Sequence, residues 1–336
     1  MNIAINGFGR IGRAAFKILF DLMEKNPSIK IVAINDLTSA ENLAYLLKYD
    51  TVYGRYTHPV SFDEKNIIVG DIKFPHYMIK DATTLPWKDL NVDIVIESTG
   101  VFTKSEDAKK HLTAGARKVL LSAPAKDDGF NTVVLGGGKD TYEGDLISNA
   151  SCTTNNVTPV LNVLEMVFGV EKSLMTTIHA YTATQGLVDG PNQKDFRSGR
   201  SGSTNIIPHS TGAAEAVVKA LPAMDKKFDG LALRVPVICG SISDITAVLK
   251  RDVTKEEVNE AFKNAQKDPQ FLRIIKYTED PIVSSDILQT PYSAIIDGQL
   301  TKVIGGNMIK VMAWYDNEWG YSNRLVETAL KLGQSL

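Results

Sequence analysis

Cysteine is scarce in this sequence, and neither sign of charge is in clear excess. Its 336 residues include two cysteines, Cys152 and Cys239, too few for the disulfide framework of a small secreted domain. Lysine and arginine together number 37 against 39 acidic residues, for a net charge of −2. A nucleic-acid-binding protein usually carries a basic patch, and a membrane-surface protein a basic amphipathic segment. We therefore expect a cytoplasmic protein that binds no nucleic acid.

Long hydrophobic runs are also missing. No stretch of about 20 apolar residues, the length of a membrane-spanning helix, occurs in the chain. We therefore expect no membrane association. Residues 2–6 form an apolar, strand-like run, which does not fit a signal peptide, because a signal peptide has a basic start and a longer apolar stretch. Hydrophobic residues make up 43% of the chain and charged residues 23%, an ordinary globular composition, and the length favours two domains.

Two patterns of secondary structure divide the chain. In the first half, strand-like and helix-like stretches alternate, which is typical of parallel βαβ units. The predicted strands there are 2–6, 29–35, 92–98 and 118–122, and the predicted helices are 10–24, 39–47 and 105–114. In the second half the predicted strands are 173–181, 230–236, 242–249, 294–297 and 308–314, and the predicted helices are 253–265 and 318–332. The second pattern favours a mixed or antiparallel sheet with helices on one face.

A glycine-rich turn links the first predicted strand to the first predicted helix. Residues 7–12 have the spacing G-x-G-x-x-G, which is a weak signal alone and a stronger one between a strand and a helix. Gly7 would allow the tight turn, and Gly9 would allow the backbone to approach a pyrophosphate closely. Gly12 would allow the helix and the strand to pack closely together. The N–H groups at the helix N-terminus would face the phosphates. The motif predicts a Rossmann-type dinucleotide site.

Asp36 follows the second predicted strand, 24 residues after Gly12. The simplest alternative is a tight turn followed by a solvated aspartate, but strand, helix and acid together favour a cofactor site. A carboxylate at this position binds the adenosine ribose and repels a 2′-phosphate. NAD is therefore the expected cofactor, and no metal site is expected.

Cys152 lies in a small, polar run, residues 148–155, ahead of an apolar series with helical spacing that begins at Val157. A thiol at a helix N-terminus has a lowered pKa and is a better nucleophile at neutral pH. Pro159 interrupts the apolar series, so the helix is either kinked or starts later. A lone cysteine is more often a small buried apolar residue, but the polar neighbours of Cys152 favour a nucleophile.

A nucleophilic thiol needs a partner that accepts its proton. The sequence has five histidines, and His179 lies near the end of the predicted strand 173–181. The other four lie in turn-like, helical or loop contexts and are interpreted as surface or structural residues. Sequence spacing does not show that His179 meets Cys152, so their pairing is a hypothesis.

These stretches resemble the family of NAD-dependent, phosphorylating glyceraldehyde-3-phosphate dehydrogenases over essentially the whole chain. The matching segments are NGFGRIGR at 6–13, ESTGVF at 97–102, ASCTTN at 150–155, NIIP at 205–208, STGAA at 210–214, RVP at 234–236 and WYDNEWGYS at 314–322. The resemblance implies an α/β protein with a Rossmann domain at 1–150, completed by a C-terminal helix at 316–336. It also implies an α+β catalytic domain at 151–315 with a mixed or antiparallel sheet.

The resemblance further implies a mechanism. The Cys152 thiolate attacks the aldehyde of glyceraldehyde 3-phosphate to give a hemithioacetal, and His179 takes the proton as hydride passes to the nicotinamide. Inorganic phosphate then cleaves the resulting thioester. The NAD contacts that the family implies come from Lys80, Ser122, Asn317 and the backbone of Arg10 and Ile11.

Two anion sites are implied by the same resemblance. Thr182 and Arg234 match the site for the phosphate of the substrate, and an arginine is suited to paired oxyanion contacts. A structural salt bridge is the alternative role for Arg234. The residues that match the site for the attacking phosphate are Ser151, Thr153, Thr211 and Gly212.

The long stretch 181–204 resembles the family's loop across a subunit interface, so the resemblance implies a homotetramer. Erythrose-4-phosphate dehydrogenase is the alternative enzyme, but its relatives tend to lack the YTATQ at 181–185. A nucleotide-binding protein without turnover is a further alternative, which the presence of both Cys152 and His179 disfavours. Three residues depart from the family's pattern: Asn156 in place of a second cysteine, Glu215 in place of a lysine, and Cys239.

Overall fold

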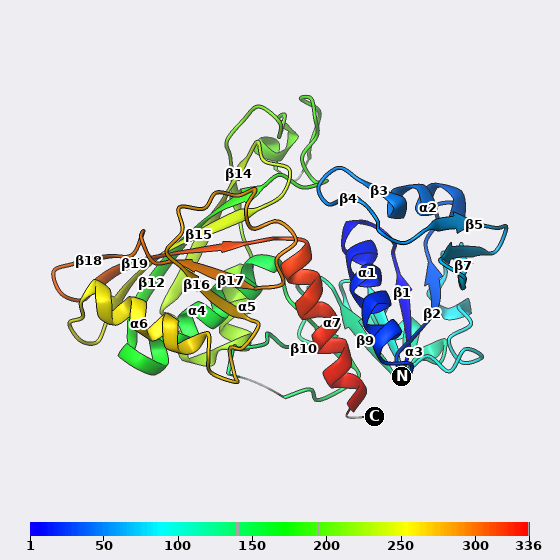
Figure 1. Cartoon of the computed structure of the whole chain (residues 1–336), viewed down its shortest axis with the longest axis horizontal. Helices are drawn as coiled ribbons and strands as arrows, with labels where there is room; N and C mark the ends of the chain where they lie inside the picture. The colour runs from blue at the N-terminus through cyan, green and yellow to red at the C-terminus, as the bar shows by residue number, and fades with distance from the viewer. Residues whose placement is uncertain (139–140, 194, 335) are drawn as a thin grey trace. The chain divides into compact units, whose positions relative to one another are not determined.

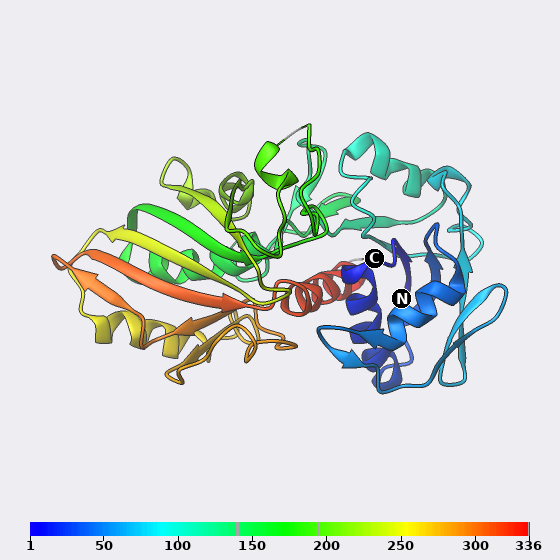
Figure 2. The same ribbon diagram turned by 90° about the horizontal axis from the view of Figure 1, so that it is seen from above.

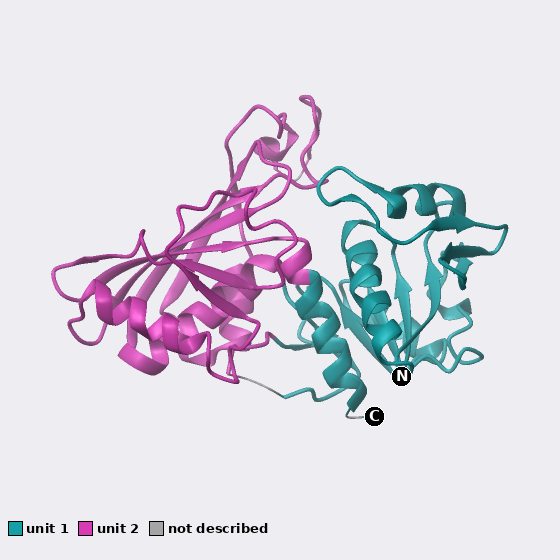
Figure 3. Cartoon of the chain, in the orientation of Figure 1, with its two compact units in different colours: residues 1–133, 141–150, 322–336 teal, residues 134–140, 151–321 magenta. Residues whose placement is uncertain are grey.

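The computed structural model of the chain describes residues 1–138, 141–193, 195–334 and 336. The chain forms two compact units (Figure 3). The first comprises residues 1–133, 141–150 and 322–336, and the second comprises residues 134–140 and 151–321. The first unit thus combines two segments that are far apart in the sequence. Across the described residues, no helix is long and apolar enough to cross a bilayer.

The first unit is built on a sheet that, in the described residues, has the strand order β10-β11-β9-β8-β1-β2-β7-β6-β5. Its strands are β1 (Asn2–Asn6), β2 (Lys30–Asn35), β5 (Val60–Phe62), β6 (Asn66–Val69), β7 (Ile72–Tyr77), β8 (Ile94–Glu97), β9 (Lys118–Leu121), β10 (Asn131–Thr132) and β11 (Leu146–Ser148). Neighbours from β10 to β7 are parallel, which confirms the predicted α/β class. The antiparallel extension β5-β6-β7 was not predicted, because its strands are short and mostly half-exposed.

Helices α1 (Arg10–Lys25), α2 (Ala40–Lys48) and α3 (Ser105–Thr113) follow strands of this sheet, and the C-terminal helix α7 (Trp319–Gln334) joins them (Figure 1). Side chains of β1 alternate between the two faces of the sheet, as the pleat requires. Ile3 and Ile5 belong to one buried apolar cluster and Ala4 belongs to another. Both faces of the sheet are therefore covered. A short hairpin, β3 (Tyr49–Asp50) and β4 (Gly54–Arg55), follows α2.

The core beside α1 is largely aromatic. Phe16 and Phe20 lie one helical turn apart on the buried face of α1. Both rings contact Phe74 of β7, at centroid distances of 4.9 and 5.9 Å. Residues from α7 complete the same cluster: Leu325, Val326, Ala329 and Leu332. The first unit thus depends on a helix that the chain supplies long after β1.

The second unit is built on a sheet that, in the described residues, has the order β13-β14-β12-β15-β19-β17-β16, with β18 paired to β19. Its strands are β12 (Val170–Ala180), β13 (Ile207–Ser210), β14 (Phe228–Val235), β15 (Ser241–Leu249), β16 (Ile275–Thr278), β17 (Ala294–Asp297), β18 (Lys302–Ile304) and β19 (Met308–Tyr315). Only β12 with β14 and β16 with β17 pair in parallel among these described strands. The predicted mixed sheet is confirmed.

Helices α4 (Cys152–Phe168), α5 (Ala213–Ala220) and α6 (Lys255–Ala265) pack against this sheet, and the yellow helix α6 runs beside β16 in Figure 2. Helix α6 begins with a capping box, in which the side chain of Thr254 and that of Glu257 each bond the other residue's backbone N–H. Residues alternate along β12: Met175 and Thr177 are buried, whereas Leu174 is 65% exposed. One face of the sheet therefore carries the helices and the other presents apolar side chains outward.

Candidate active site

The glycine-rich turn has the geometry that its sequence predicts. Gly7 has φ +91°, a left-handed conformation that favours glycine, and a Cβ there would lie 2.6 Å from the backbone nitrogen of Thr99. A Cβ on Gly12 would collide with the carbonyl oxygen of Gly7. No atom lies within 4 Å of a Cβ built on Gly9, the N-cap of α1. The turn therefore leaves open space at the helix N-terminus, where free N–H groups favour an anion.

A cavity of about 420 Å³, here called the glycine-turn cavity, lies beside this turn. Its lining residues are Asn6, Gly7, Gly9, Asn35, Asp36, Leu37, Ile79, Lys80, Ala82, Leu85, Ser98, Thr99, Val101 and Phe102. Four sequence-predicted residues thus meet here: Gly7, Gly9, Asp36 and Lys80. The described lining does not include the five other predicted residues: Arg10, Ile11, Gly12, Ser122 and Asn317.

The carboxylate of Asp36 is anchored at the end of β2. Its Oδ2 accepts from the backbone N–H of Phe8 at 2.7 Å, and its Oδ1 accepts from that of Thr38 at 2.9 Å. An acid fixed at the edge of an apolar cavity and beside an open helix N-terminus fits a dinucleotide. The side chain of Arg10 is engaged elsewhere, in an ion pair with Asp50 at 2.7 Å, so its backbone is the part left to face a pyrophosphate. The Ser122 N–H donates to the carbonyl of Glu97.

Helix α4 begins at Cys152. Ser151 is its N-cap, and the Ser151 Oγ accepts from the backbone N–H of Thr154 at 3.0 Å. Pro159 lies inside the helix. The alternative of a later helix start is therefore wrong. The strong cap at Ser151 fixes the start, because it satisfies an N–H that would otherwise lack a partner. Cys152 therefore lies in the first turn, as predicted.

The structure brings Cys152 and His179 together. The Cys152 Sγ lies 3.3 Å from the Nε2 of His179, which is near the C-terminal end of β12. The His179 Nδ1 lies 2.6 Å from the carbonyl oxygen of Ala180. In the tautomer that donates Nδ1–H to this carbonyl, the Nε2 lone pair faces the thiol. The predicted contact between Cys152 and His179 is confirmed, and the role of His179 as a general base stays a prediction.

Tyr315 supports this pair and was missed in the sequence. Its hydroxyl lies 3.0 Å from the Thr153 Oγ1 and 2.8 Å from the Thr177 Oγ1. Its ring meets that of His179 edge-on at 5.9 Å. Burial raises the pKa of Tyr315, so the phenol stays neutral. Its place within the WYDNEWGYS segment was a signal of importance, but it did not indicate a contact with His179.

Burial governs the titration of the pair. Burial, together with the nearby positive charge of Arg234, lowers the pKa of His179 to about 3. The imidazole is therefore neutral at physiological pH and able to accept a proton. Burial also raises the pKa of the Cys152 thiol, with Arg234 and hydrogen bonds from Thr153 acting in the opposite direction. The prediction that the helix N-terminus lowers the pKa of Cys152 is wrong. Desolvation of the thiolate outweighs the effect of the helix N-terminus.

Arg234, on β14, lies beside the same histidine. Its Nη1 is 2.5 Å from the His179 Nδ1 and 3.3 Å from the carbonyl oxygen of Ala180. Nδ1 cannot accept from Arg234 while it donates to Ala180, so the two contacts alternate. The Arg234 Nε is buried and has no hydrogen-bond partner among the described residues. A half-buried guanidinium with an unused, buried Nε donor fits an anion better than a structural salt bridge.

Three other predicted anion-binding residues lie in the loops after β12 and β13: Thr182, Thr211 and Gly212. The Thr182 Oγ1 lies 2.8 Å from the Thr184 Oγ1. Thr211 follows β13, whose Ile207 is paired with Arg234, and its Oγ1 accepts from the backbone N–H of Ala213. Gly212 is the N-cap of α5 and has no side chain that could bond the helix N-terminus. Within the described residues, no hydrogen bond joins Thr182 or Thr211 to Arg234.

Asn317 has its carboxamide orientation fixed. Its Oδ1 accepts from the backbone N–H of Gly240 at 3.0 Å and from the Ser241 Oγ at 3.1 Å. Cys239 is buried, and its Sγ donates to Asp316 at 3.3 Å. The cysteine at 239 thus has a structural account, because its thiol supports the Asp316–Asn317 turn.

Asn156 is completely buried within α4. Its Nδ2 donates to the carbonyl of Ser293 at 3.0 Å and to that of Ala313 at 3.4 Å, which a cysteine could not do equally well. Glu215 is mostly exposed and forms an ion pair with Lys219 at 3.2 Å. An exposed pair of this kind contributes little to stability.

Comparisons with known proteins agree with this geometry. Residues 1–105 match the family model described as "Glyceraldehyde 3-phosphate dehydrogenase, NAD binding domain", and residues 151–317 match "Glyceraldehyde 3-phosphate dehydrogenase, C-terminal domain". The chain is 50% identical over 339 residues to the glyceraldehyde-3-phosphate dehydrogenase of Streptomyces coelicolor. It is 50% identical over 341 residues to that of Mycobacterium avium, and 49% over 342 residues to that of Mycolicibacterium smegmatis. Each comparison covers 100% of this chain and 99% of the relative.

Proposed function

The chain belongs to the glyceraldehyde 3-phosphate dehydrogenase family, and on that premise we propose the reaction it catalyses. It oxidises D-glyceraldehyde 3-phosphate with NAD and inorganic phosphate to 1,3-bisphosphoglycerate, a step of glycolysis and, in reverse, of gluconeogenesis. The observation that carries this proposal is the 3.3 Å contact between the Cys152 Sγ and the His179 Nε2. Nothing in the relatives favours erythrose 4-phosphate as the substrate.

Cys152 and His179 perform the covalent chemistry. The thiol gives its proton to the neutral imidazole as sulfur attacks the aldehyde carbon, and His179 passes this proton to the resulting alkoxide oxygen, which completes the hemithioacetal. His179 then takes the hydroxyl proton while the C–H bond of the hemithioacetal breaks and its hydride leaves. Inorganic phosphate attacks the thioester carbonyl, the C–S bond breaks, and the acyl phosphate leaves. Cys152 returns as a thiol when His179 gives back a proton.

Residues around the glycine-turn cavity hold the cofactor in this proposal. NAD supplies the acceptor for the hydride that leaves the hemithioacetal. Asp36 binds the adenosine ribose and disfavours a 2′-phosphate, while the α1 N-terminus from Gly9 to Gly12 binds the pyrophosphate. Lys80 and Ser122 add polar contacts, and Asn317 orients the nicotinamide amide. The fixed Asp36 carboxylate and the open space at Gly9 support this assignment.

Two anion sites complete the proposal. Arg234 and Thr182 bind the phosphate of the substrate, which is supported by the unused, buried Nε of Arg234. The attacking phosphate is bound by hydroxyl and backbone N–H groups of four residues: Ser151, Thr153, Thr211 and Gly212. A helix N-terminus at Gly212 without a capping side chain supports that role.

The proposed reaction is tested by following NADH absorbance with glyceraldehyde 3-phosphate and NAD, in the presence and absence of inorganic phosphate. We expect sustained turnover only with phosphate, because the thioester otherwise stays on Cys152 after a single oxidation. Erythrose 4-phosphate should give a much lower kcat/KM. A higher kcat/KM with erythrose 4-phosphate, or turnover indifferent to phosphate, would contradict the proposal.

The same assay separates the two anion sites. Arg234→Leu should raise the KM for the aldehyde by about 100-fold or more, because a charged hydrogen bond to phosphate is lost. Thr211→Ala should instead raise the KM for inorganic phosphate by about tenfold. Equal effects of both variants on both constants would show that the sites are assigned wrongly.

We also propose that the chain assembles as a homotetramer and that it works in the cytoplasm. Support for assembly comes from apolar side chains that face outward on two parts of the second unit. On the sheet face Leu174 is 65% exposed and Leu231 is 46% exposed. In the loop after β12, Leu187, Val188 and Phe196 are each more than 70% exposed. Large exposed apolar patches mark protein interfaces.

Light scattering tests the assembly. We expect a mass of about four times the 36.8 kDa chain. The double variant Leu174→Asp and Leu231→Asp should lower that mass, because it places buried charges in the interface. Met166→Asp, which changes an exposed side chain of α4, is the matched control and should leave the mass unchanged. A monomeric wild-type chain would exclude the tetramer.

A further inference from the structure

A buried carboxylate lies behind the wall of the glycine-turn cavity. Glu97, the last residue of β8, is completely buried. Its Oε2 accepts from the Asn6 Nδ2 and lies 3.0 Å from the Nε2 of His111. Its Oε1 accepts from both the backbone N–H and the hydroxyl of Thr99. Neither the thiol chemistry nor the proposed NAD contacts use this group.

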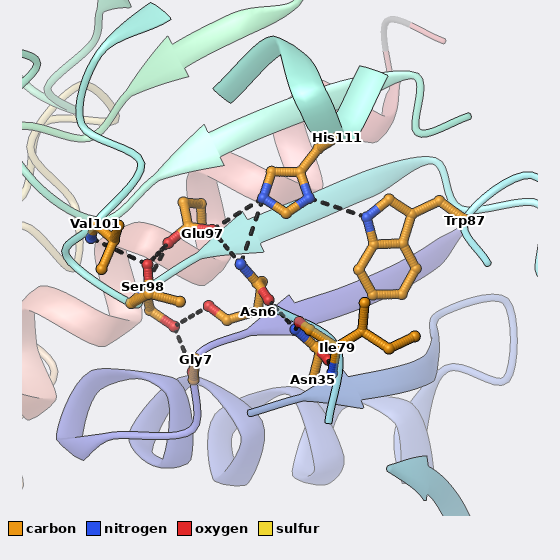
Figure 4. Close-up of polar contacts among 10 residues, drawn as sticks. Asn6, Gly7, Asn35, Ile79, Trp87, Glu97, Ser98, Val101 and His111 are labelled. Atoms are coloured by element: carbon orange, nitrogen blue, oxygen red, sulfur yellow. Dashed lines mark hydrogen bonds and ion pairs between the residues drawn. The ribbon is translucent and has the colours of Figure 1, made fainter. Parts of the chain in front are cut away.

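His111 presents a donor to Glu97 because of Trp87. The Trp87 Nε1–H donates to the His111 Nδ1 at 3.0 Å (Figure 4), and an indole nitrogen can only donate. Nδ1 is therefore the acceptor, and Nε2 carries the hydrogen that faces the carboxylate. Trp87 and His111 are completely buried, so water cannot replace either bond.

Four donors thus converge on two oxygens: the Asn6 amide, the His111 Nε2–H, and the N–H and hydroxyl of Thr99. An ionised carboxylate, which only accepts, can satisfy all of them. The amide of a glutamine would bring two hydrogens of its own against two of these donors. The position therefore requires a charged acceptor and not merely a polar side chain.

The network extends from Glu97 into the cavity. Asn6 and Thr99 both line it. The Asn6 Oδ1 accepts from the Asn35 Nδ2 at 2.7 Å. Asn35 in turn bonds both backbone groups of Ile79, at 2.9 and 3.0 Å, and both of these residues also line the cavity. One carboxylate thereby sets the positions of wall residues from β1, β2 and the segments after β7 and β8.

We propose that Glu97, with its hydrogen bonds fixed by His111 and Trp87, is a positioning residue for NAD. It holds Asn6 and Thr99, and through Asn6 also Asn35, in the arrangement that binds the cofactor. This inference rests on the proposed function of the glycine-turn cavity as the NAD site. Because the network touches neither Cys152 nor His179, its loss weakens NAD binding and leaves the chemistry at saturating NAD intact.

The decisive experiment measures the Kd for NAD by calorimetry, the KM for NAD, kcat and the melting temperature. Glu97→Gln should raise Kd and KM by about tenfold, because it leaves buried donors without an acceptor, with kcat changed by less than about threefold. His111→Asn keeps an acceptor for Trp87 but has no donor at the Nε2 position, so it should raise Kd similarly. His111→Gln restores a donor to Glu97 and should bring Kd back to within about threefold of wild type.

Two control variants separate positioning from general destabilisation. Leu112→Ala removes an apolar side chain from the same helix as His111 but touches none of the network, so it should lower the melting temperature without changing Kd. Asp36→Ala tests the cavity itself and should raise Kd. Equal Kd values for His111→Asn and His111→Gln would overturn the positioning role, even if Glu97→Gln fails to fold.

The two levels of the proposal fail differently. Loss of NAD binding in Asp36→Ala, with wild-type Kd in Glu97→Gln and His111→Asn, would overturn the positioning role alone. Wild-type Kd in every variant, Asp36→Ala included, would overturn the assignment of the cavity to NAD as well.

Discussion

Replacing Cys152 with serine should lower kcat by about 10⁴-fold or more, since the covalent route is lost. A serine hydroxyl is far less acidic than a thiol, and the buried, neutral imidazole of His179 is too weak a base to ionise it. The NADH assay with saturating substrates measures the loss. The NAD Kd should stay at the wild-type value, because Cys152 does not line the glycine-turn cavity.

The other cysteine provides the matched control. Cys239→Ser exchanges one donor for another at a buried position, so the bond to Asp316 is kept. We expect its kcat within about threefold of wild type. If Cys239→Ser were as inactive as Cys152→Ser, the thiol chemistry would not be confined to Cys152.

Replacing His179 with asparagine should lower kcat by about 10³-fold, the usual contribution of a positioned general base. The asparagine amide can still donate to the Ala180 carbonyl from the place of Nδ1, but no group remains near the thiol to take its proton. The KM for NAD should hardly change. His58→Asn, at a half-exposed position in the first unit, is the control and should retain full activity.

The pH dependence of the free energy of unfolding, compared between wild type and His179→Asn, is a second and independent test of the state of His179. In the folded protein the pKa of His179 is about 3, against an ordinary value of 6.5. Between these values the unfolded chain binds a proton that the folded chain does not, so stability falls as the pH falls from 6.5 towards 3. The asparagine variant lacks this term, which amounts to about 5 kcal/mol at most. Identical acid unfolding of the two proteins would show that His179 is not buried in the neutral form.

The sequence predicted those features that depend on local pattern. The parallel strands of the first unit follow from apolar runs that alternate with helical spacing, and Gly7 and Gly12 follow from backbone conformations that other residues rarely adopt. The antiparallel strands β5 to β7 did not follow, because half-exposed strands lack a clear apolar run. The NGFGRIGR and ASCTTN motifs directed attention to the glycine-rich turn and to Cys152, whose roles in this chain stay predictions.

Long-range contacts were out of reach of the sequence. Glu97 lay within a recognised segment, yet its burial against His111, 14 positions away, depends on the packing of α3 on the sheet. His111 was interpreted as a surface or structural residue because a lone histidine in a helix gives no sign of its partners. The pKa of Cys152 was predicted in the wrong direction for a similar reason: the helix N-terminus is a local feature, whereas desolvation depends on the whole fold.

The contribution of α7 to the core of the first unit has a consequence for how the protein is made. The ribosome synthesises β1 and α1 first. Their core is completed only some 300 residues later, by four residues of α7: Leu325, Val326, Ala329 and Leu332. Until then, α7 does not cover the residues of this cluster, so we expect the nascent first unit to expose apolar side chains. Exposed apolar surface of this kind promotes aggregation and is a target for chaperones. The first unit is therefore begun first during translation, but it is completed only after α7, the last helix, has been synthesised.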